Sequence, residues 1–360
     1  MATVTGNVKA HGFNIPRNCV VTGGSGFVGQ RLVEMLVERG AERVVSFDIA
    51  PKPKDAQESS KISYIQGDLT NPQAVLDATE GANCVFHIAA LVGPYHPKEA
   101  YVKVNYEGTL NVLNACKHHD IKKLVFSSSP STRFPYPDPN VNNLTEDDLK
   151  KINEGNIHLH YNKQPWHFTN LLPMELGDFA PVFLQPYAET KAMGEKAAMD
   201  ACGRKEGDLL TIAVAPHQVY GPRDGLFLPN LLETAGSGKL RIFGEGNNII
   251  SFCHVDNYCH GLILGAEALY PNSPALGKFY IITDGPGQQF WKVLDIAVVA
   301  MGFQSLWEKM KLPTWFMMAI AHMVLFFGNI FAACSGVPQH KVNYYLKLNP
   351  FAVQMLVIHR

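Results

Sequence analysis

The sequence has no excess of charge of either sign. Its 360 residues include 31 Lys and Arg against 32 Asp and Glu, which gives a net charge of −1. Proteins that bind the phosphate backbone of a nucleic acid usually present a basic patch or stripe. We therefore expect no nucleic-acid partner.

Cysteine is sparse, and its spacing suggests no pairing. The seven cysteines are odd in number, lie scattered along the chain and form no Cys-x-x-Cys motif. This pattern favours free thiols in a reducing compartment over a disulfide framework or a zinc site. His158, His160 and His167 also lack zinc-ligand spacing, so we expect no metal. The first fifteen residues contain no apolar run typical of a signal peptide.

Charged residues are missing altogether from WFMMAIAHMVLFFGNIFAAC, residues 315–334. This stretch satisfies the roughly 20-residue requirement for a membrane-spanning helix. His322 and Asn329 interrupt it, and a helix that is apolar all round can instead lie in a protein core. The stretch is therefore a membrane span, a helix at the membrane surface or a core helix.

Much of the chain alternates short apolar runs with amphipathic stretches. The apolar runs lie at residues 18–23, 43–48, 62–68, 84–90 and 123–129, with later ones at 209–216 and 278–283. Amphipathic stretches at 29–40 and 100–119 are typical of helices between strands. This order predicts an α/β fold with a Rossmann-type doubly wound parallel sheet. We also expect a smaller, discontinuous substrate lobe and a C-terminal apolar helical segment.

The sequence TGGSGFVG at residues 22–29 follows the first apolar run and opens an amphipathic stretch. Its glycines permit a tight turn, a close approach to a pyrophosphate and close packing of helix on strand. The helix N-terminus offers N–H groups and the positive end of the helix dipole to phosphate. The candidate cofactor-binding residues of this turn are Gly23, Ser25, Gly26, Phe27, Val28 and Gly29.

A carboxylate follows at the distance that this motif requires. Asp48 ends the second apolar run, 19 residues beyond Gly29. There it can bind the adenosine ribose hydroxyls and repel a 2′-phosphate, so we predict NAD as the cofactor in preference to NADP. Asp68, which closes the third run, either reaches the adenine or caps a turn. Further candidate cofactor-binding residues are Leu69, Ala89, Tyr187, Lys191 and Pro216.

These features divide the chain into three expected parts. Residues 16–216 form the NAD-binding Rossmann domain, with an insertion at about 134–178. Residues 217–310 form mainly the substrate lobe, and the late strand near 278–283 returns to the sheet. Residues 311–360 form the apolar C-terminal segment. Insertions beyond the carboxyl ends of strands are where doubly wound folds place ligand contacts.

Tyr187 and Lys191 lie four residues apart in QPYAETKAMGEKAAM, residues 185–199. On a helix they share one face, one turn apart. A free phenol has a pKa of about 10 and is a poor base at neutral pH. A neighbouring ammonium and a positive nicotinamide favour the phenolate, so we expect the pKa of Tyr187 to fall toward the working range. Lys191 can also hold the nicotinamide ribose.

Together with the Gly-rich turn and FSSS at the end of the fifth strand, this pair resembles the extended short-chain dehydrogenase/reductases. The resemblance implies that Tyr187 and Lys191 are catalytic and that Ser129 hydrogen-bonds the reacting oxygen. The family usually places this serine much closer to the tyrosine than the 58 residues that separate them here. Residues 134–178 therefore hold an insertion, which either lines the pocket or is a surface excursion.

Residues 244–261 distinguish two subgroups of these enzymes. Nucleotide-sugar members place an arginine for the substrate diphosphate at the position that Ile250 occupies here. The 3β-hydroxysteroid dehydrogenase family, and within it the decarboxylating sterol-4α-carboxylate 3-dehydrogenases, is more similar. The stretches that carry this likeness are residues 214–248, 254–269 and 279–303. Arg223 and Asp224 are common to both subgroups, and we interpret them as structural first and substrate-contacting second.

The resemblance implies NAD-dependent oxidation of the 3β-hydroxyl of a sterol 4α-carboxylate with decarboxylation. One alternative is a 3β-hydroxy-Δ5-steroid dehydrogenase/isomerase. Another is a non-catalytic NAD-binding sensor, although such proteins typically lack the tyrosine or the lysine. A lipid substrate favours membrane insertion or interfacial burial of residues 315–334 over a core position, on the cytosolic face of the endoplasmic reticulum. A homodimer is also compatible with the family. Comparison with family members further implies that residues 311–360 are a truncated C-terminal segment.

Overall fold

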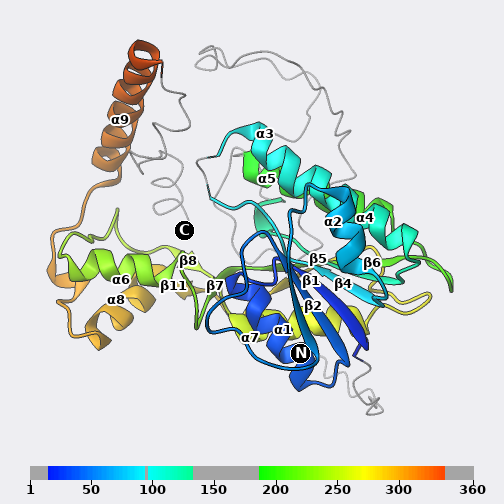
Figure 1. Cartoon of the computed structure of the whole chain (residues 1–360). Helices are drawn as coiled ribbons and strands as arrows, with labels where there is room; N and C mark the ends of the chain where they lie inside the picture. The colour runs from blue at the N-terminus through cyan, green and yellow to red at the C-terminus, as the bar shows by residue number, and fades with distance from the viewer. Residues whose placement is uncertain (1–14, 94–95, 133–185, 337–360) are drawn as a thin grey trace.

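The computed structural model describes residues 15–93, 96–132 and 186–336 (Figure 1). The expected insertion at 134–178 lies outside the described residues, as do His158, His160 and His167 within it. The C-terminal residues 337–360 also lie outside them.

Seven strands form one parallel sheet. Their spatial order is β10 (Phe279–Ile282), β6 (Leu210–Pro216), β5 (Lys123–Ser127), β4 (Cys84–His87), β1 (Asn18–Thr22), β2 (Arg43–Asp48) and β3 (Ile62–Gln66). The strand order reverses between β1 and β4, which is where doubly wound sheets bind ligands. The predicted α/β fold with a doubly wound parallel sheet is confirmed.

Helices cover both faces of the sheet (Figure 1). One face carries α1 (Phe27–Glu38) and α7 (Val255–Glu267), and the other carries α2 (Pro72–Thr79), α4 (Gly108–His118) and α5 (Pro186–Asp200). Successive residues of a strand point to opposite faces. Cys19 and Val21 of β1 therefore lie in one core, and Val20 lies in the other. This burial on both sides explains why the strands are continuous apolar runs.

The helix expected at residues 100–119 is interrupted. It consists of α3 (Lys98–Tyr101), a π-helical segment η1 (Val102–Glu107) and α4. The side chain of Asn105 in η1 is buried, accepts a hydrogen bond from the Leu91 N–H at 2.7 Å and donates one to the Leu91 carbonyl at 3.2 Å. The wider turn thus ties the helix to the segment that follows β4.

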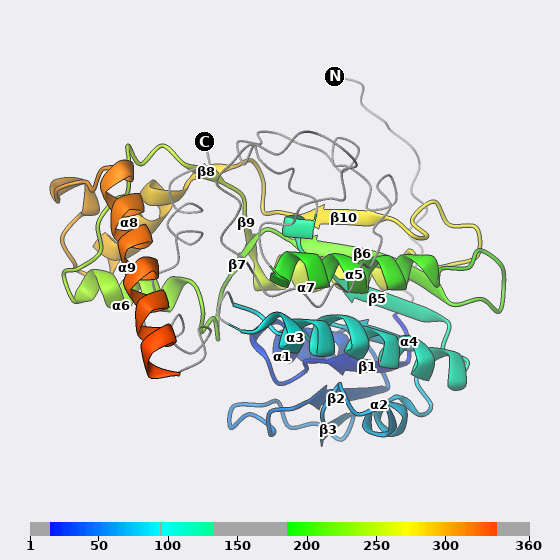
Figure 2. The ribbon, with the colours of Figure 1, turned by 90° about the horizontal axis from the view of Figure 1, so that it is seen from above.

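A smaller lobe lies beside one end of the sheet (Figure 2). It contains β7 (Gln218–Tyr220), α6 (Leu228–Gly236), β8 (Ile249–Ile250), β9 (Phe252–His254), β11 (Gln288–Gln289), α8 (Phe290–Ala300) and the 3₁₀ turn η3 (Leu306–Glu308). The lobe has its own apolar core, in which Trp291 and Ile242 are fully buried. It is discontinuous, as predicted, because α7 and β10 return to the main sheet between its parts.

The apolar stretch near the C-terminus forms the helix α9 (Thr314–Ser335), which projects from the smaller lobe (Figure 1). Its large apolar side chains that are exposed to solvent are Trp315, Phe316, Met323, Phe326, Phe327, Ile330 and Phe331. This exposure argues against the core-helix interpretation. Over the described residues, no helix combines the length and apolarity needed to cross a membrane.

Candidate functional site

The Gly-rich turn joins β1 to α1 where the strand order reverses. Gly23 has a φ of +73°, and a Cβ on it would lie 2.8 Å from the backbone nitrogen of Ala89. A Cβ on Gly29 would lie 1.9 Å from the carbonyl oxygen of Gly23, so only glycine lets α1 pack this closely on the turn. Gly26 is the N-cap of α1, which has no side-chain cap. Phe27 and Val28 are the first residues of α1, and the backbone N–H groups of this first turn are free to bind a phosphate group.

Asp48 ends β2 beside this turn. Its Oδ2 accepts a hydrogen bond from the Ser25 N–H at 3.0 Å, and its Oδ1 accepts one from the Ala50 N–H at 2.9 Å. These bonds fix the carboxylate next to the N-terminus of α1 and leave each oxygen a further lone pair. The site therefore fits the adenosine ribose of NAD, and the discrimination against NADP stays a prediction.

Four further cofactor candidates, Asp68, Leu69, Ala89 and Pro216, lie at the carboxyl ends of strands or shortly after them. Asp68 accepts a hydrogen bond from the Thr70 N–H at 2.8 Å, so it caps a turn, which is one of its two expected roles. Leu69 beside it is buried. Ala89 lies against the Gly-rich turn, and Pro216 is the last residue of β6. The last two lie at the carboxyl edge of the sheet, as a cofactor contact would require.

The structure brings Tyr187, Lys191 and Ser129 together at the end of β5. Tyr187 and Lys191 lie on α5, and the Ser129 hydroxyl is near enough to Tyr187 to lower its pKa. The Lys191 Nζ donates to the carbonyl of Ser127 at 2.6 Å and lies 4.6 Å from the ring centroid of Phe126. The three candidate catalytic residues thus occupy one site despite their separation in the chain.

Burial changes the pKa values of this pair. It raises the pKa of Tyr187 to about 12, although the hydrogen bond from Ser129 opposes the rise. Desolvation dominates the pKa of Tyr187, and the fall expected beside a positive nicotinamide stays a prediction. Burial lowers the pKa of Lys191 to about 8, and the carboxylate of Glu195 opposes this fall.

Glu195 belongs to this site but was not singled out from the sequence. It is completely buried and accepts hydrogen bonds from the hydroxyls of Ser128 and Thr132, the latter at 3.3 Å. It follows Lys191 by four residues, as Lys191 follows Tyr187. That spacing, which places all three on one face of a helix, is the signal that could have identified it.

His87 on β4 is a second buried polar group near the site. Its Nδ1 lies 2.7 Å from the Thr22 hydroxyl and its Nε2 lies 3.0 Å from the Thr109 hydroxyl. Burial, and then the charge of Lys191, lower its pKa to about 3. His87 is therefore neutral at working pH and connects β1, β4 and α4 beneath the site.

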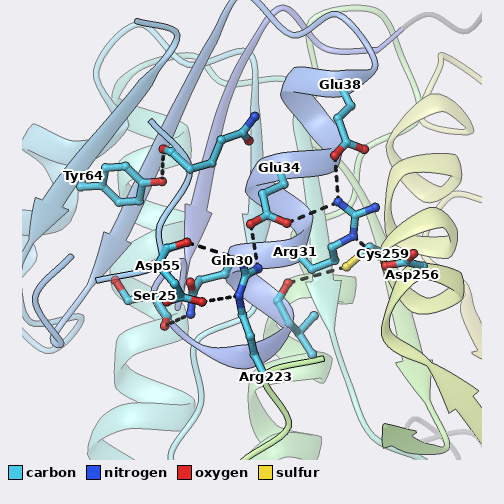
Figure 3. Close-up of polar contacts among 12 residues, drawn as sticks. Ser25, Gln30, Arg31, Glu34, Glu38, Asp55, Tyr64, Arg223, Asp256 and Cys259 are labelled. Carbon is cyan, nitrogen blue, oxygen red and sulfur yellow. Dashed lines mark hydrogen bonds and ion pairs between the residues drawn. The ribbon is translucent and has the colours of Figure 1, made fainter. Parts of the chain in front are cut away.

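Arg223 ties the smaller lobe to the adenosine edge of the dinucleotide site (Figure 3). Its Nη1 lies 2.7 Å from Glu34 of α1, and its Nε lies 2.7 Å from Asp55 in the β2–β3 connection. Its φ of +71° is unusual for a residue other than glycine. Asp224 accepts hydrogen bonds from three backbone N–H groups, including that of Leu228, at the start of α6. Both residues thus make structural contacts, the first of their two expected roles, and contact with substrate stays a prediction.

The seven cysteines are free thiols, as their spacing indicated. Burial raises the pKa of Cys19 and Cys116 to about 12, so these thiols stay protonated. Across the described ranges, no group of three or more His, Cys, Asp or Glu side chains is arranged to hold a metal ion.

Several curated proteins resemble this chain. Human sterol-4-alpha-carboxylate 3-dehydrogenase, decarboxylating, is 33% identical over 87% of this chain and 74% of its own length. The 3beta-hydroxysteroid-dehydrogenase/decarboxylase isoform 2 of Arabidopsis thaliana is 33% identical over 86% of this chain and 51% of its own length. The 2-alkyl-3-oxoalkanoate reductase of Stenotrophomonas maltophilia is 32% identical over 79% of this chain and 75% of its own length.

Solved structures share the fold. The epimerase Mth375 of Methanothermobacter thermautotrophicus superposes with a TM-score of 0.63 at 20% identity, covering 82% of this chain and 79% of that chain. MoeE5 in complex with UDP-glucuronic acid and NAD gives a TM-score of 0.61 at 24% identity, covering 82% and 85%. At these identities the likeness concerns the fold alone.

A family model matches most of the chain. The model of the 3-beta hydroxysteroid dehydrogenase/isomerase family covers residues 20–167 and 174–313. Its two parts include the Gly-rich turn, Asp48, Ser129, Tyr187 and Lys191, so the match extends over the whole site. The chain therefore belongs to the 3-beta hydroxysteroid dehydrogenase/isomerase family, whose members are NAD-dependent oxidoreductases that act on a CH–OH group.

Proposed function

We propose that the protein oxidises the 3β-hydroxyl of a sterol 4α-carboxylate with NAD and that the product loses CO₂. The observation that carries this proposal is the joining of Ser129, Tyr187 and Lys191 at the end of β5. The chain that holds this site is similar to decarboxylating sterol-4-alpha-carboxylate 3-dehydrogenases of several species. A non-catalytic NAD-binding sensor would not need all three of these side chains.

One residue of the site transfers the proton, and the others orient the substrate and the cofactor. Tyr187 takes the proton of the 3β-hydroxyl, and Ser129 donates a hydrogen bond to the same oxygen. Lys191 supplies a positive charge that favours the phenolate form of Tyr187 and holds a ribose hydroxyl. NAD, when bound, supplies the hydride acceptor and a positive charge that also favours the phenolate. Asp48 and the N-terminus of α1 orient the adenosine ribose and the pyrophosphate.

Decarboxylation requires no further catalytic residue. Oxidation at C3 places a ketone β to the carboxylate on C4, and such an acid loses CO₂ through an enolate. The names of two relatives share this feature, since a sterol 4-alpha-carboxylate and a 2-alkyl-3-oxoalkanoate both carry the carboxylate on the carbon that neighbours C3, which bears the oxygen. The similarity to both proteins supports a carboxylate-bearing substrate.

A second candidate is the oxidation of a simple 3β-hydroxysteroid, with or without isomerisation. It is favoured by the family description and by a 32% identical 3-beta-hydroxysteroid dehydrogenase of Mycolicibacterium neoaurum. Isomerisation of a Δ5 double bond needs a proton shuttle between C4 and C6. We assign no residue of this chain to that shuttle.

Separate assays with two substrates distinguish the two candidate functions. Purified protein with NAD receives either a 3β-hydroxysterol 4α-carboxylate or a 3β-hydroxy-Δ5-steroid without the carboxylate, and NADH and CO₂ are both followed. We expect NADH and CO₂ from the carboxylate, with a much lower kcat/KM for the simple steroid. NADH from the simple steroid alone would establish the second candidate. NADH and CO₂ from neither would contradict both.

We also propose that α9 lies in a membrane surface, where a sterol substrate is dissolved. The support is the set of exposed aromatic and aliphatic side chains on this helix, which water solvates poorly. Lys309 and Lys311 precede the helix, as basic residues often do at a lipid interface. The cytosolic face of the endoplasmic reticulum remains our prediction for this membrane.

A further inference from the structure

We propose that Glu195 is a positioning residue for the reaction: its buried carboxylate holds the loop that carries Ser129 and keeps Lys191 protonated. This inference rests on the proposed function of the site. Glu195 lies on α5 one turn beyond Lys191, and its side chain points at the segment after β5. It does not contact the reacting atoms and acts through its neighbours.

The carboxylate fixes the Ser129 loop on both sides. The hydroxyl of Ser128, which precedes Ser129, and the hydroxyl of Thr132, three residues after it, both donate to Glu195 Oε2. The Thr132 hydroxyl also donates to the Ser129 carbonyl at 2.8 Å, and the Ser128 N–H donates to the Val214 carbonyl at 2.9 Å. The backbone at Ser129 is thus tied to α5 and β6, which fixes where its hydroxyl meets Tyr187.

A carboxylate at this position brings a negative charge in addition to its hydrogen bonds to Ser128 and Thr132. An ionised carboxylate is far more costly to bury than a neutral amide, unless a nearby positive charge offsets the cost. A glutamine would accept the same two hydroxyl hydrogen bonds with its amide oxygen. Lys191 lies one turn away on the same helix and is 3% exposed. A charge on Glu195 therefore acts on Lys191 through a buried part of the protein, where water screens it little.

The other titratable groups around the pair do not replace this charge. His87 on β4 is neutral because burial and Lys191 lower its pKa to about 3. Tyr101 on α3 and Tyr258 on α7 are neutral phenols, because burial raises the pKa of each. Glu189 on α5 is paired with Lys98 at 2.8 Å. Burial lowers the pKa of Lys191 to about 8, and Glu195 is the charge that opposes this fall.

The sign of the effect follows from this balance. Lys191 must be an ammonium to favour the phenolate of Tyr187, so activity falls on the alkaline side as Lys191 loses its proton. Without the negative charge of Glu195, the pKa of Lys191 falls further. Side chains four residues apart on a helix begin roughly 6 Å apart, and a charge at that distance with an effective dielectric constant of about 20 corresponds to about one to two pH units.

The first test compares Glu195→Gln, which keeps the hydrogen-bond acceptor, with Thr132→Val, which removes one donor and no charge. The alkaline limb of the kcat profile should move about one to two pH units lower in Glu195→Gln and stay in place in Thr132→Val. KM for the sterol should change little in either variant. An alkaline limb at the same pH in wild type and Glu195→Gln would overturn the proposal.

The second test needs no turnover. Lysine labelled with ¹³C at Cε reports each lysine pKa by NMR, and Lys191→Arg assigns the Lys191 signal. We expect this signal to titrate lower in Glu195→Gln than in wild type. If Glu195→Gln does not fold, Glu195→Asp replaces it, and its shorter side chain should also give a lower Lys191 titration than in wild type. An unchanged Lys191 titration would overturn the proposal. Because the titration is read without substrate, an inactive wild type would contradict only the proposed function.

Discussion

The Arg223 contact is a quantitative test of how the smaller lobe is attached to the dinucleotide-binding domain. Arg223 lies between β7 and α6, whereas its partners Glu34 and Asp55 lie near the start of the chain. The side chains of Arg223 and Glu34 are 29% and 15% exposed, and that of Asp55 is 61% exposed. We therefore expect the Glu34 pair to contribute most of the stability.

The expected magnitude follows from this difference in exposure. A charged hydrogen bond is worth about 1.5–3 kcal/mol when it is shielded from solvent, and an exposed ion pair contributes about 0–1 kcal/mol. Because Glu34 is only partly shielded, Arg223→Ala should lower the free energy of unfolding by about 1–2 kcal/mol. Asp55→Asn should have a clearly smaller effect. Arg223→Gly should cost less than Arg223→Ala, since glycine relieves the positive φ at this position.

The measurement is urea unfolding of the variants at neutral pH and moderate salt. The matched control is Arg17→Ala, since Arg17 pairs with Glu42 at 2.8 Å on an exposed surface, with side chains 76% and 54% exposed. We expect this control to change the stability by less than about 0.5 kcal/mol. If Arg223→Ala were as mild as the control, the contact would not attach the lobe and our interpretation of Figure 3 would be wrong.

Four further results are expected. Tyr187→Phe should reduce kcat by about 10²- to 10⁴-fold while calorimetry still detects NAD binding, and retained turnover would remove Tyr187 from the mechanism. Lys191→Ala should weaken both turnover and NAD binding, in contrast to Tyr187→Phe. Wild type should bind NAD far more tightly than NADP, and Asp48→Ala should narrow this gap; equal wild-type affinities would contradict the assignment of Asp48. Phe326→Ser with Phe327→Ser should weaken co-sedimentation with phospholipid vesicles at least about tenfold, whereas wild-type protein that never sediments with vesicles would exclude the membrane role of α9.

Much of the fold could be predicted because its signals are local. Each strand of the large sheet is buried on both faces, so it is a continuous apolar run in the sequence. The Gly-rich turn was recognisable because the closeness of Gly29 to Gly23 allows only glycine. Tyr187 and Lys191 were recognisable because four residues make one helical turn.

The remaining features depend on contacts between distant parts of the chain. Nothing near Arg223 indicates that it pairs with Glu34, and the π-helical segment at Val102–Glu107 depends on how Asn105 meets Leu91. The pKa of Tyr187 is expected to fall beside a lysine and a positive nicotinamide, but the sequence alone does not show how deeply the phenol is buried. In the folded protein desolvation decides its direction. Such effects follow from tertiary packing, which spacing along the sequence does not encode.

The central claim is that oxidation at C3 and loss of the C4 carboxylate are coupled on one substrate. The most direct measurement uses a 3β-hydroxysterol 4α-carboxylate that carries deuterium at C3 and ¹³C in the carboxylate, with wild-type protein and NAD. We predict deuterated NADH and ¹³CO₂ in equal amounts by mass spectrometry, and a rate of formation of both that is about 10²- to 10⁴-fold lower with Tyr187→Phe. Deuterium that stays on the sterol would contradict the account. So would deuterated NADH without ¹³CO₂, with the 3-keto acid accumulating as a stable product.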